Sequence, residues 1–171
     1  MNDGTGDPGP GSQAPGPRFR RLGLMVASVF GVGYIPVAPG TCGSAVGLLV
    51  WAAVGPSPIA QAVAIVALFA VGSWSGDVAE HHFGHTDPRY VVVDEVMGMM
   101  VTLFMNPVGW PGALGAFLLF RLFDVIKPYP ANRLERLHGG IGVMADDGMA
   151  AIYANLALRL LVALAHRFTW P

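Results

Sequence analysis

Charged side chains are scarce in this chain and are missing from two long stretches. Only 12% of the 171 residues are Asp, Glu, Lys or Arg, against 53% hydrophobic residues, and an ordinary soluble domain carries about twice that share of charge. No residue carries a formal charge between Arg21 and Asp77, or from Val96 to Phe120. A soluble fold places charges on its solvent face within intervals of this length, so the composition favours a membrane protein.

Cysteine and excess positive charge are nearly absent as well. Cys42 is the single cysteine, so an intramolecular disulfide is excluded. The formal net charge of -1 gives no footprint for a polyanion, which argues against nucleic acid as a partner. The chain has no Walker A ending of the Gly-Lys-Ser/Thr type, which argues against nucleotide binding. We place His81, His82 and His85 in an exposed polar loop without a nearby cysteine, and no zinc site is expected there.

The first 17 residues are rich in glycine and proline and lack an apolar core. We expect residues 1–17 to form a disordered tail and residues 18–171 to form a single helical domain. Arg18, Arg20 and Arg21 precede an apolar run. Because positively charged flanks tend to stay in the cytoplasm, we expect the N-terminus on that side of a membrane.

The hydrophobic pattern predicts an all-α fold, a compact and membrane-associated bundle of about six to seven mostly hydrophobic helices. We expect helices over residues 22–30, 41–54, 59–74, 90–105, 113–127, 132–137 and 143–166, with Thr41 as the cap of the second. The third should continue past residue 74 into the polar Asp77 and Glu80, as a helix that emerges into water. Most of the apolar runs are near 15 residues, against about 20 needed to cross a bilayer core. Either some helices join across their loops, or the domain sits partly in the membrane with its polar cluster at one surface.

Two adjacent carboxylates, Asp94 and Glu95, interrupt the apolar run 91–101. An ionised carboxylate taken out of water costs several kcal/mol unless it is paired, hydrogen-bonded or bound to metal. On a helix the two side chains point about 100° apart, so we expect them to bracket a site rather than to bind one ion as a closed pair. Asp146 and Asp147 form a second pair with the same geometry.

With Asp124 the chain has up to five carboxylates beside apolar sequence, more than Arg121 and Lys127 can neutralise. Oxygen ligands alone favour Mg²⁺, which often completes its coordination with a phosphate. We therefore predict a Mg²⁺ site with the ligands Asp94, Glu95, Asp124, Asp146 and Asp147. The alternative is a set of structural ion pairs with Arg121, Lys127, Arg133 and Arg136.

Two further groups are suited to phosphate. Arg121, Asp124 and Lys127 share one helix face, where we expect the two cations to form a phosphate clamp. The alternative is a helix end with i,i+3 ion pairs, which would be the better explanation on a surface helix. The glycine- and proline-rich segment 39–44 brings free backbone N–H groups and the hydroxyls of Thr41 and Ser44 to a helix start, which is a natural anion site. Plain helix capping explains that segment nearly as well.

Taken in order, these clusters resemble the phosphatidylglycerophosphatase A family of bacterial phospholipid biosynthesis. The resemblance covers about Leu22 to Leu161. The matching stretches are Gly31 to Ser44 with its Pro-x-Ala-Pro-Gly-Thr-x-Gly-Ser pattern, Val93-Asp94-Glu95-Val96-x-Gly-Met, Phe120-Arg121-x-x-Asp124-x-x-Lys127-Pro128, and His138-Gly-Gly-x-Gly-x-Met-x-Asp146-Asp147.

The resemblance implies a Mg²⁺-dependent phosphatase of the bacterial cytoplasmic (inner) membrane, a phosphoric monoester hydrolase that converts phosphatidylglycerophosphate to phosphatidylglycerol. We expect its active site on the cytoplasmic side, with the catalytic residues Asp94, Glu95, Arg121, Asp124 and Lys127. Water is the expected nucleophile, because the Asp-x-Asp arrangement of aspartyl-phosphate enzymes is absent. The main alternative is an ion or proton transporter with intramembrane carboxylates, and a third is a non-catalytic lipid-binding scaffold.

Overall fold

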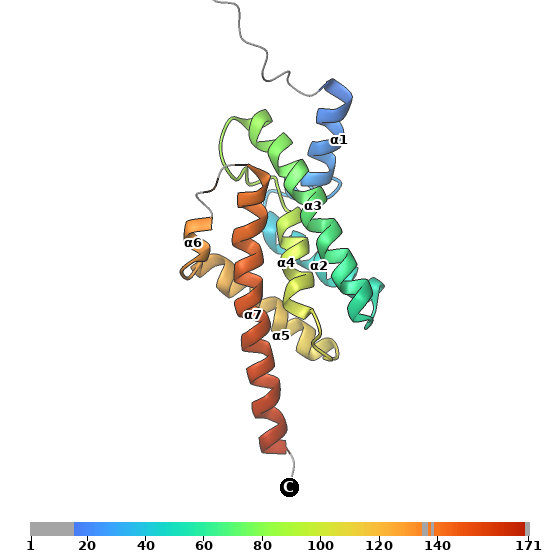
Figure 1. Ribbon diagram of the computed structural model, residues 1–171, viewed down its shortest axis with the longest axis vertical. Helices are drawn as coiled ribbons and strands as arrows, with labels where there is room; N and C mark the ends of the chain where they lie inside the picture. Colours follow the sequence, from blue (N-terminus) through green and yellow to red (C-terminus); the bar gives the residue numbers. More distant parts are fainter. Residues whose placement is uncertain (1–15, 135–136, 138, 170–171) are drawn as a thin grey trace, which may run out of the picture.

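The computed structural model describes residues 16–134, 137 and 139–169, and these residues form helices and no strand (Figure 1). This confirms the predicted all-α class. The elements are α1 (Pro17–Ala27), η1 (Val32–Tyr34, a 3₁₀ turn), α2 (Pro39–Val54), α3 (Pro58–Phe83), α4 (Val93–Leu103), α5 (Trp110–Ile126), α6 (Ala131–Leu134) and α7 (Gly140–Thr169).

The bundle is built around α4, which packs against α2, α3, α5 and α7. One core cluster joins α4 to α2, α5 and α7 and contains Met99, Leu103 and Phe120. A second cluster joins α4 to α1, α3 and α7 and contains Met97 and Met144. The long helices α3 and α7 run along the molecule, and the C-terminal part of α7 extends beyond the other helices (Figure 1). Because α4 is enclosed on several sides, polar groups on its first turn lie in the interior.

Glycines let α2 lie very close to α4. A Cβ built on Gly43 would lie 2.9 Å from the Val92 carbonyl oxygen, and one on Gly47 would lie 2.8 Å from the Val96 carbonyl oxygen. Any side chain at these positions would push the two helices apart. The close contact brings the start of α2 beside the first turn of α4.

Two helices are longer than the apolar runs of about 15 residues in the sequence. Helix α3 has 26 residues and α7 has 30, because each continues through its charged residues, as expected from the sequence. Each holds an 18-residue window of mean hydropathy 1.7, of which only 22% is buried. A core helix of a soluble protein would be mostly buried. Both helices are thus long and apolar enough to cross a membrane, and their exposed apolar surface indicates membrane association.

Several predicted boundaries were displaced. The first helix begins at Pro17, ahead of its apolar run, and ends at Ala27, because Val29 and Phe30 adopt positive φ angles of 47° and 55°. The fourth helix is shorter than the predicted 90–105. The last helix is longer than 143–166 at both ends.

Two other expectations concern helix starts and the terminal tail. Thr41 does not cap α2, because the helix already begins at Pro39, whose fixed φ suits a first turn. The predicted short helix 132–137 is α6, which ends at Leu134, and residues 135 and 136 lie outside the described part of the chain. Residues 1–15 of the predicted tail and His138 lie outside it as well.

Candidate active site

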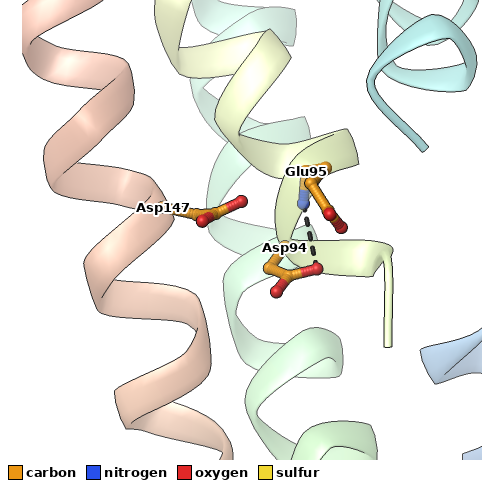
Figure 2. A group of neighbouring side chains, drawn as sticks. All are labelled: Asp94, Glu95 and Asp147. Atoms are coloured by element: carbon orange, nitrogen blue, oxygen red, sulfur yellow. Dashed lines mark hydrogen bonds between the residues drawn. The ribbon is translucent and has the colours of Figure 1, made fainter. Parts of the chain in front are cut away.

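Three carboxylates from two helices converge in the interior. Asp94 and Glu95 lie in the first turn of α4, and Asp147 reaches toward them from α7 (Figure 2). Each contributes an oxygen, and these oxygens all lie within 4.8 Å of one another. Asp94 and Asp147 are only 6% and 4% exposed. Asp147 from α7 completes this group, which Asp94 and Glu95 do not form by themselves. The expectation that Asp94 and Glu95 do not bind one ion as a closed pair stays a prediction.

The three carboxylates are poorly neutralised by the protein itself. Asp94 Oδ1 accepts a hydrogen bond from the Glu95 backbone N–H at 3.0 Å. Glu95 Oε2 and Asp147 Oδ2 are buried and have no hydrogen-bond partner in the described part of the chain. Burial raises the pKa of Asp94 to about 6. Burial, and then the charge of Asp94, raise the pKa of Glu95 well above its usual range. A cluster of this kind is stabilised by a cation.

The donor set fits a hard divalent metal. Asp94, Glu95 and Asp147 offer oxygen atoms only, as Mg²⁺ prefers, and the group holds neither histidine nor cysteine. The two unpartnered oxygens of Glu95 and Asp147 are the kind of acceptor that a bound ion satisfies. These three residues are therefore suited to hold Mg²⁺.

Asp124 and Asp146, the other two predicted ligands, each contact a cation of the protein. Arg121 Nη1 lies 2.6 Å from Asp124 Oδ2 and 3.9 Å from Glu95 Oε1. No N–H on Nη1 is aligned with an acceptor among the described residues, so the close contact with Asp124 is given as an ion pair. Lys127 Nζ donates to Asp146 Oδ2 at 2.6 Å. The five predicted carboxylates thus divide into a group of three and two ion pairs that border it.

The predicted structural ion pairs are present in part. Arg121 and Lys127 make them, as that alternative required. Arg133 instead stacks over the ring of Tyr129, with its guanidinium carbon 5.2 Å from the ring centre. Arg136 lies outside the described residues. Among the described residues, ion pairing with these cations is close for Asp124 and Asp146 and longer, at 3.9 Å, for Glu95.

The start of α2 lies directly against these charges. A Cβ built on Gly40 would overlap Glu95 Oε1 and would lie 3.2 Å from both terminal nitrogens of Arg121. Backbone N–H groups in a first helical turn lack intrahelical partners and attract anions. Thr41 is exposed in this turn. Ser44 is fully buried, and its hydroxyl donates to the Gly40 carbonyl oxygen at 2.9 Å. Thr41 is thus free to meet a ligand, whereas Ser44 is engaged within its own helix.

Sequence reasoning overlooked Asp87, which lies in the loop before α4. Its charge adds to the rise in the pKa of Asp94, so it lies near enough to act on the cluster. Its backbone N–H donates to Glu80 Oε1 at 3.4 Å, and Glu80 Oε2 accepts from the Gly139 N–H at 2.9 Å. The sequence offers one signal, an acidic residue seven positions before Asp94. The partner that turns the loop inward, Glu80, comes from α3.

The histidines lie near this loop and outside the cluster. His81 and His82 belong to the last turns of α3, so their expected place in a loop was wrong, while His85 follows the helix. All three are exposed, as predicted. With Glu80 and Thr86, two of them line a polar hollow of about 580 Å³. An apolar cavity of about 490 Å³ is lined by Trp51 and Trp110 and lies at the C-terminal end of α2. Because α2 is about 24 Å long and its first turn borders the carboxylates, this cavity is not part of the site.

Comparison with known proteins gives a consistent result. A family model described as Phosphatidylglycerophosphatase A matches residues 25–162. A protein of Bacteroides thetaiotaomicron named "Putative phosphatidylinositol-3-phosphatase" is 35% identical over 147 residues, 80% of this chain and 91% of that protein.

Two further relatives carry the name of the family model. The Phosphatidylglycerophosphatase A of Haemophilus influenzae is 35% identical over 140 residues, 78% of this chain and 85% of that protein. The protein of the same name from Escherichia coli K12 is 31% identical over 150 residues, 86% of this chain and 84% of that protein. No solved structure gives a significant match.

Proposed function

Since the chain belongs to the phosphatidylglycerophosphatase A family and is a phosphatase, we propose that it hydrolyses the terminal phosphomonoester of phosphatidylglycerophosphate with the help of Mg²⁺. The observation that carries the proposal is the group of three carboxylates, two buried and one partly buried, with two unpartnered oxygens in the described part of the chain, bordered by Arg121 and the start of α2. An ion or proton transporter is not favoured, because the matching family and relatives are named as phosphatases.

Asp94, Glu95 and Asp147 are the proposed metal ligands. Mg²⁺, when bound, supplies a Lewis acid for the phosphoryl group and for the attacking water. The protein's share is to hold the three carboxylates together, one pair on α4 and the third on α7. It also excludes bulk water from two of them, since Asp94 and Asp147 are almost fully buried.

The phosphomonoester is proposed to lie between Arg121 and the first turn of α2. Arg121 is partly exposed, with 22% of its side chain accessible, so a ligand reaches it without unfolding the site. Asp124 holds the guanidinium in place from one side. The Gly40 and Thr41 N–H groups and the Thr41 hydroxyl are the proposed donors from the first turn of α2. These groups stabilise negative charge on the non-bridging oxygens as it develops.

Lys127 is proposed as the second cation of the phosphate site. It ends α5 with a positive φ of 42°, and its ammonium group is held by Asp146. As a compact charge it attracts the dianionic phosphate, whereas Arg121 orients it through planar N–H donors. Asp124 and Asp146 thus act mainly on these cations.

The side from which the headgroup enters is proposed to be the polar end of α3. The hollow beside Glu80, His81 and His85 opens there, and the loop with Asp87 leads from it toward Asp94. Phe19 of α1 contacts Trp74 of α3 with ring centres 5.0 Å apart, so the basic start of α1 lies along the same stretch of α3. A basic flank favours the cytoplasmic face of the bacterial inner membrane.

The direct test is release of inorganic phosphate from phosphatidylglycerophosphate dispersed in detergent, with Mg²⁺ and with EDTA. We expect release with Mg²⁺ only, and its loss in Asp94→Asn and Asp124→Asn. His82→Ala is the control, because this exposed side chain does not line the polar hollow and contacts only the neighbouring Phe83 ring among the interactions described. Absence of release from folded protein under every metal condition would refute the proposal.

Headgroup preference is tested in the same assay. One relative is named for phosphatidylinositol 3-phosphate, so that lipid serves as the competing substrate at equal concentration. We expect faster turnover of phosphatidylglycerophosphate. Preference for the inositol lipid would retain a lipid phosphatase and change its substrate.

A further inference from the structure

A polar network lies at the end of α4 that is remote from the carboxylates. The Asn155 side-chain amide on α7 reaches the carbonyl oxygens of Val101, Thr102 and Phe104 at 3.1, 2.9 and 2.9 Å. Arg159 Nε donates to Asn155 Oδ1 at 2.8 Å, and its Nη2 donates to the Phe104 carbonyl oxygen at 3.0 Å. The last carbonyls of a helix have no intrahelical partner. Side chains of α7 therefore satisfy the C-terminal end of α4, Asn155 from a buried position and Arg159 from an exposed one.

The network and the carboxylates share one register between α4 and α7. Asp94 meets Asp147, and Thr102 meets Asn155, and both pairs are 53 positions apart in the sequence. The two helices are parallel here, because both contacts advance in the same direction. Eight residues separate the two levels on each helix, or about 12 Å along the axis. Fixing the contact between Thr102 and Asn155 therefore also fixes the axial position and the rotation of Asp147 relative to Asp94.

A metal site is sensitive to this register. A slip of α7 by one residue would shift Asp147 by about 1.5 Å and rotate it by about 100°, whereas Mg²⁺–oxygen distances are held to about 0.2 Å. Apolar packing alone does not fix the register of α7 against α4. Small buried residues on α7, such as Ala151 and Ala154, offer similar surfaces to α4 at neighbouring positions. Directed hydrogen bonds discriminate between such positions.

We propose that Asn155 and Arg159 are positioning residues, which lock α7 in register with α4 so that Asp147 meets Asp94 and Glu95 in a metal-binding arrangement. The inference rests on the proposed metal site. The action of both residues passes through the helices, since Asn155 lies about two turns and Arg159 about three turns from Asp147 along α7.

The test is Mn²⁺ binding, followed by electron paramagnetic resonance on the full chain in detergent, with thermal unfolding measured in EDTA. Asn155→Leu keeps the size of the side chain and removes its donors, and we expect its Mn²⁺ dissociation constant to rise at least tenfold. Arg159→Lys keeps the charge and loses the bond to Asn155, and a rise of about two- to fivefold is expected. Leu158→Ala is the matched control, because Leu158 is a buried neighbour on α7 without a polar side chain.

A positioning role predicts weaker Mn²⁺ binding in Asn155→Leu and in Arg159→Lys. In Leu158→Ala it predicts a Mn²⁺ affinity within twofold of wild type, despite the loss of thermal stability. Equal weakening in Leu158→Ala would overturn the inference, because general destabilisation would then explain the effect. Unchanged affinity in Asn155→Leu would overturn it too, as would a wild-type protein that binds no Mn²⁺. If Asn155→Leu does not fold, Arg159→Lys carries the comparison. Wild-type protein that binds Mn²⁺ without releasing phosphate from lipid would remove the proposed function and leave the inference in place.

Discussion

Gly40→Ala separates the role of the site from that of the fold. Gly40 lies in the first turn of α2, where a Cβ would overlap Glu95 Oε1 and press on both terminal nitrogens of Arg121. Restoring ordinary van der Waals separation requires the carboxylate end to move by roughly 1 Å. The atoms displaced are the ends of flexible side chains, so the helices need not separate. The substitution therefore disturbs a proposed metal ligand and a proposed phosphate ligand together.

We expect kcat/KM for phosphate release to fall by about 10- to 100-fold in Gly40→Ala, which is a loss of about 1.4 to 2.7 kcal/mol of transition-state stabilisation. The free energy of unfolding should change little, because alanine favours a helix by up to about 1 kcal/mol over glycine and offsets the crowding. The assay is phosphate release at several substrate and Mg²⁺ concentrations, together with thermal unfolding.

Two other glycines provide matched controls. A Cβ on Gly115 of α5 meets nothing within 4 Å, so Gly115→Ala should keep full activity and gain stability. A Cβ on Gly47 meets the Val96 backbone, so Gly47→Ala should lower the free energy of unfolding by about 1 to 3 kcal/mol. Wild-type kcat/KM in folded Gly40→Ala would show that Glu95 and Arg121 do not act beside α2, and would refute the reasoning.

Three further predictions concern the charges. Asp147→Asn should abolish stabilisation by Mg²⁺ in thermal melts, yet unfold no earlier than wild type in EDTA, because it removes one of three crowded carboxylates; a large loss of stability in EDTA would contradict this. Arg121→Lys should lower kcat/KM by about 10- to 100-fold, mainly through KM, since lysine cannot offer two planar donors; an unchanged KM would exclude the phosphate contact. The raised pKa of Asp94, about 6 against 3.8 in the unfolded chain, means that the folded state binds the proton more tightly, so metal-free protein should lose stability as pH rises from about 4 through 6. Melts in EDTA at pH 5 and pH 8 test this sign, and Mg²⁺ should reverse it because the ligands bind as carboxylates.

The sequence predicts the residue types of the site better than their grouping. Adjacent carboxylates in an apolar run identify Asp94, Glu95, Asp146 and Asp147 without any structure, because packing does not call for buried charge. Which oxygens meet depends on the register of α4 against α7, and that register is set by long-range contacts such as those of Asn155. Sequence spacing therefore could not separate Asp147, which joins the group of three, from Asp146, which contacts Lys127.

For the helices too, the sequence predicts the local structure better than the long-range contacts. The all-α class follows from long apolar stretches broken by glycine and proline. The continuation of α3 through Asp77 and Glu80 was expected from the sequence, whereas the partners of these two carboxylates were not. In the structure Asp77 Oδ1 accepts from the Gly140 N–H at 2.7 Å, and Glu80 accepts from Gly139. These carboxylates hold the start of α7, a role that depends on an element 60 residues away and leaves no mark in the local pattern.

The order in which ligands enter the site follows from its charge. Among the described residues of the site, the carboxylates outnumber Arg121 and Lys127 by three, and both cations already contact carboxylates. A phosphomonoester is itself an anion, so its approach to the metal-free cluster is opposed by Coulomb repulsion, which is strong where burial lowers the dielectric. Protonation relieves part of this repulsion, as the raised pKa values of Asp94 and Glu95 indicate, but a protonated carboxyl is a poor metal ligand. Binding of a divalent cation instead removes the repulsion and keeps the ligands charged. The carboxylates therefore repel phosphate when no metal is bound, and they hold the cation that attracts phosphate when metal is bound. Metal should thus bind before substrate.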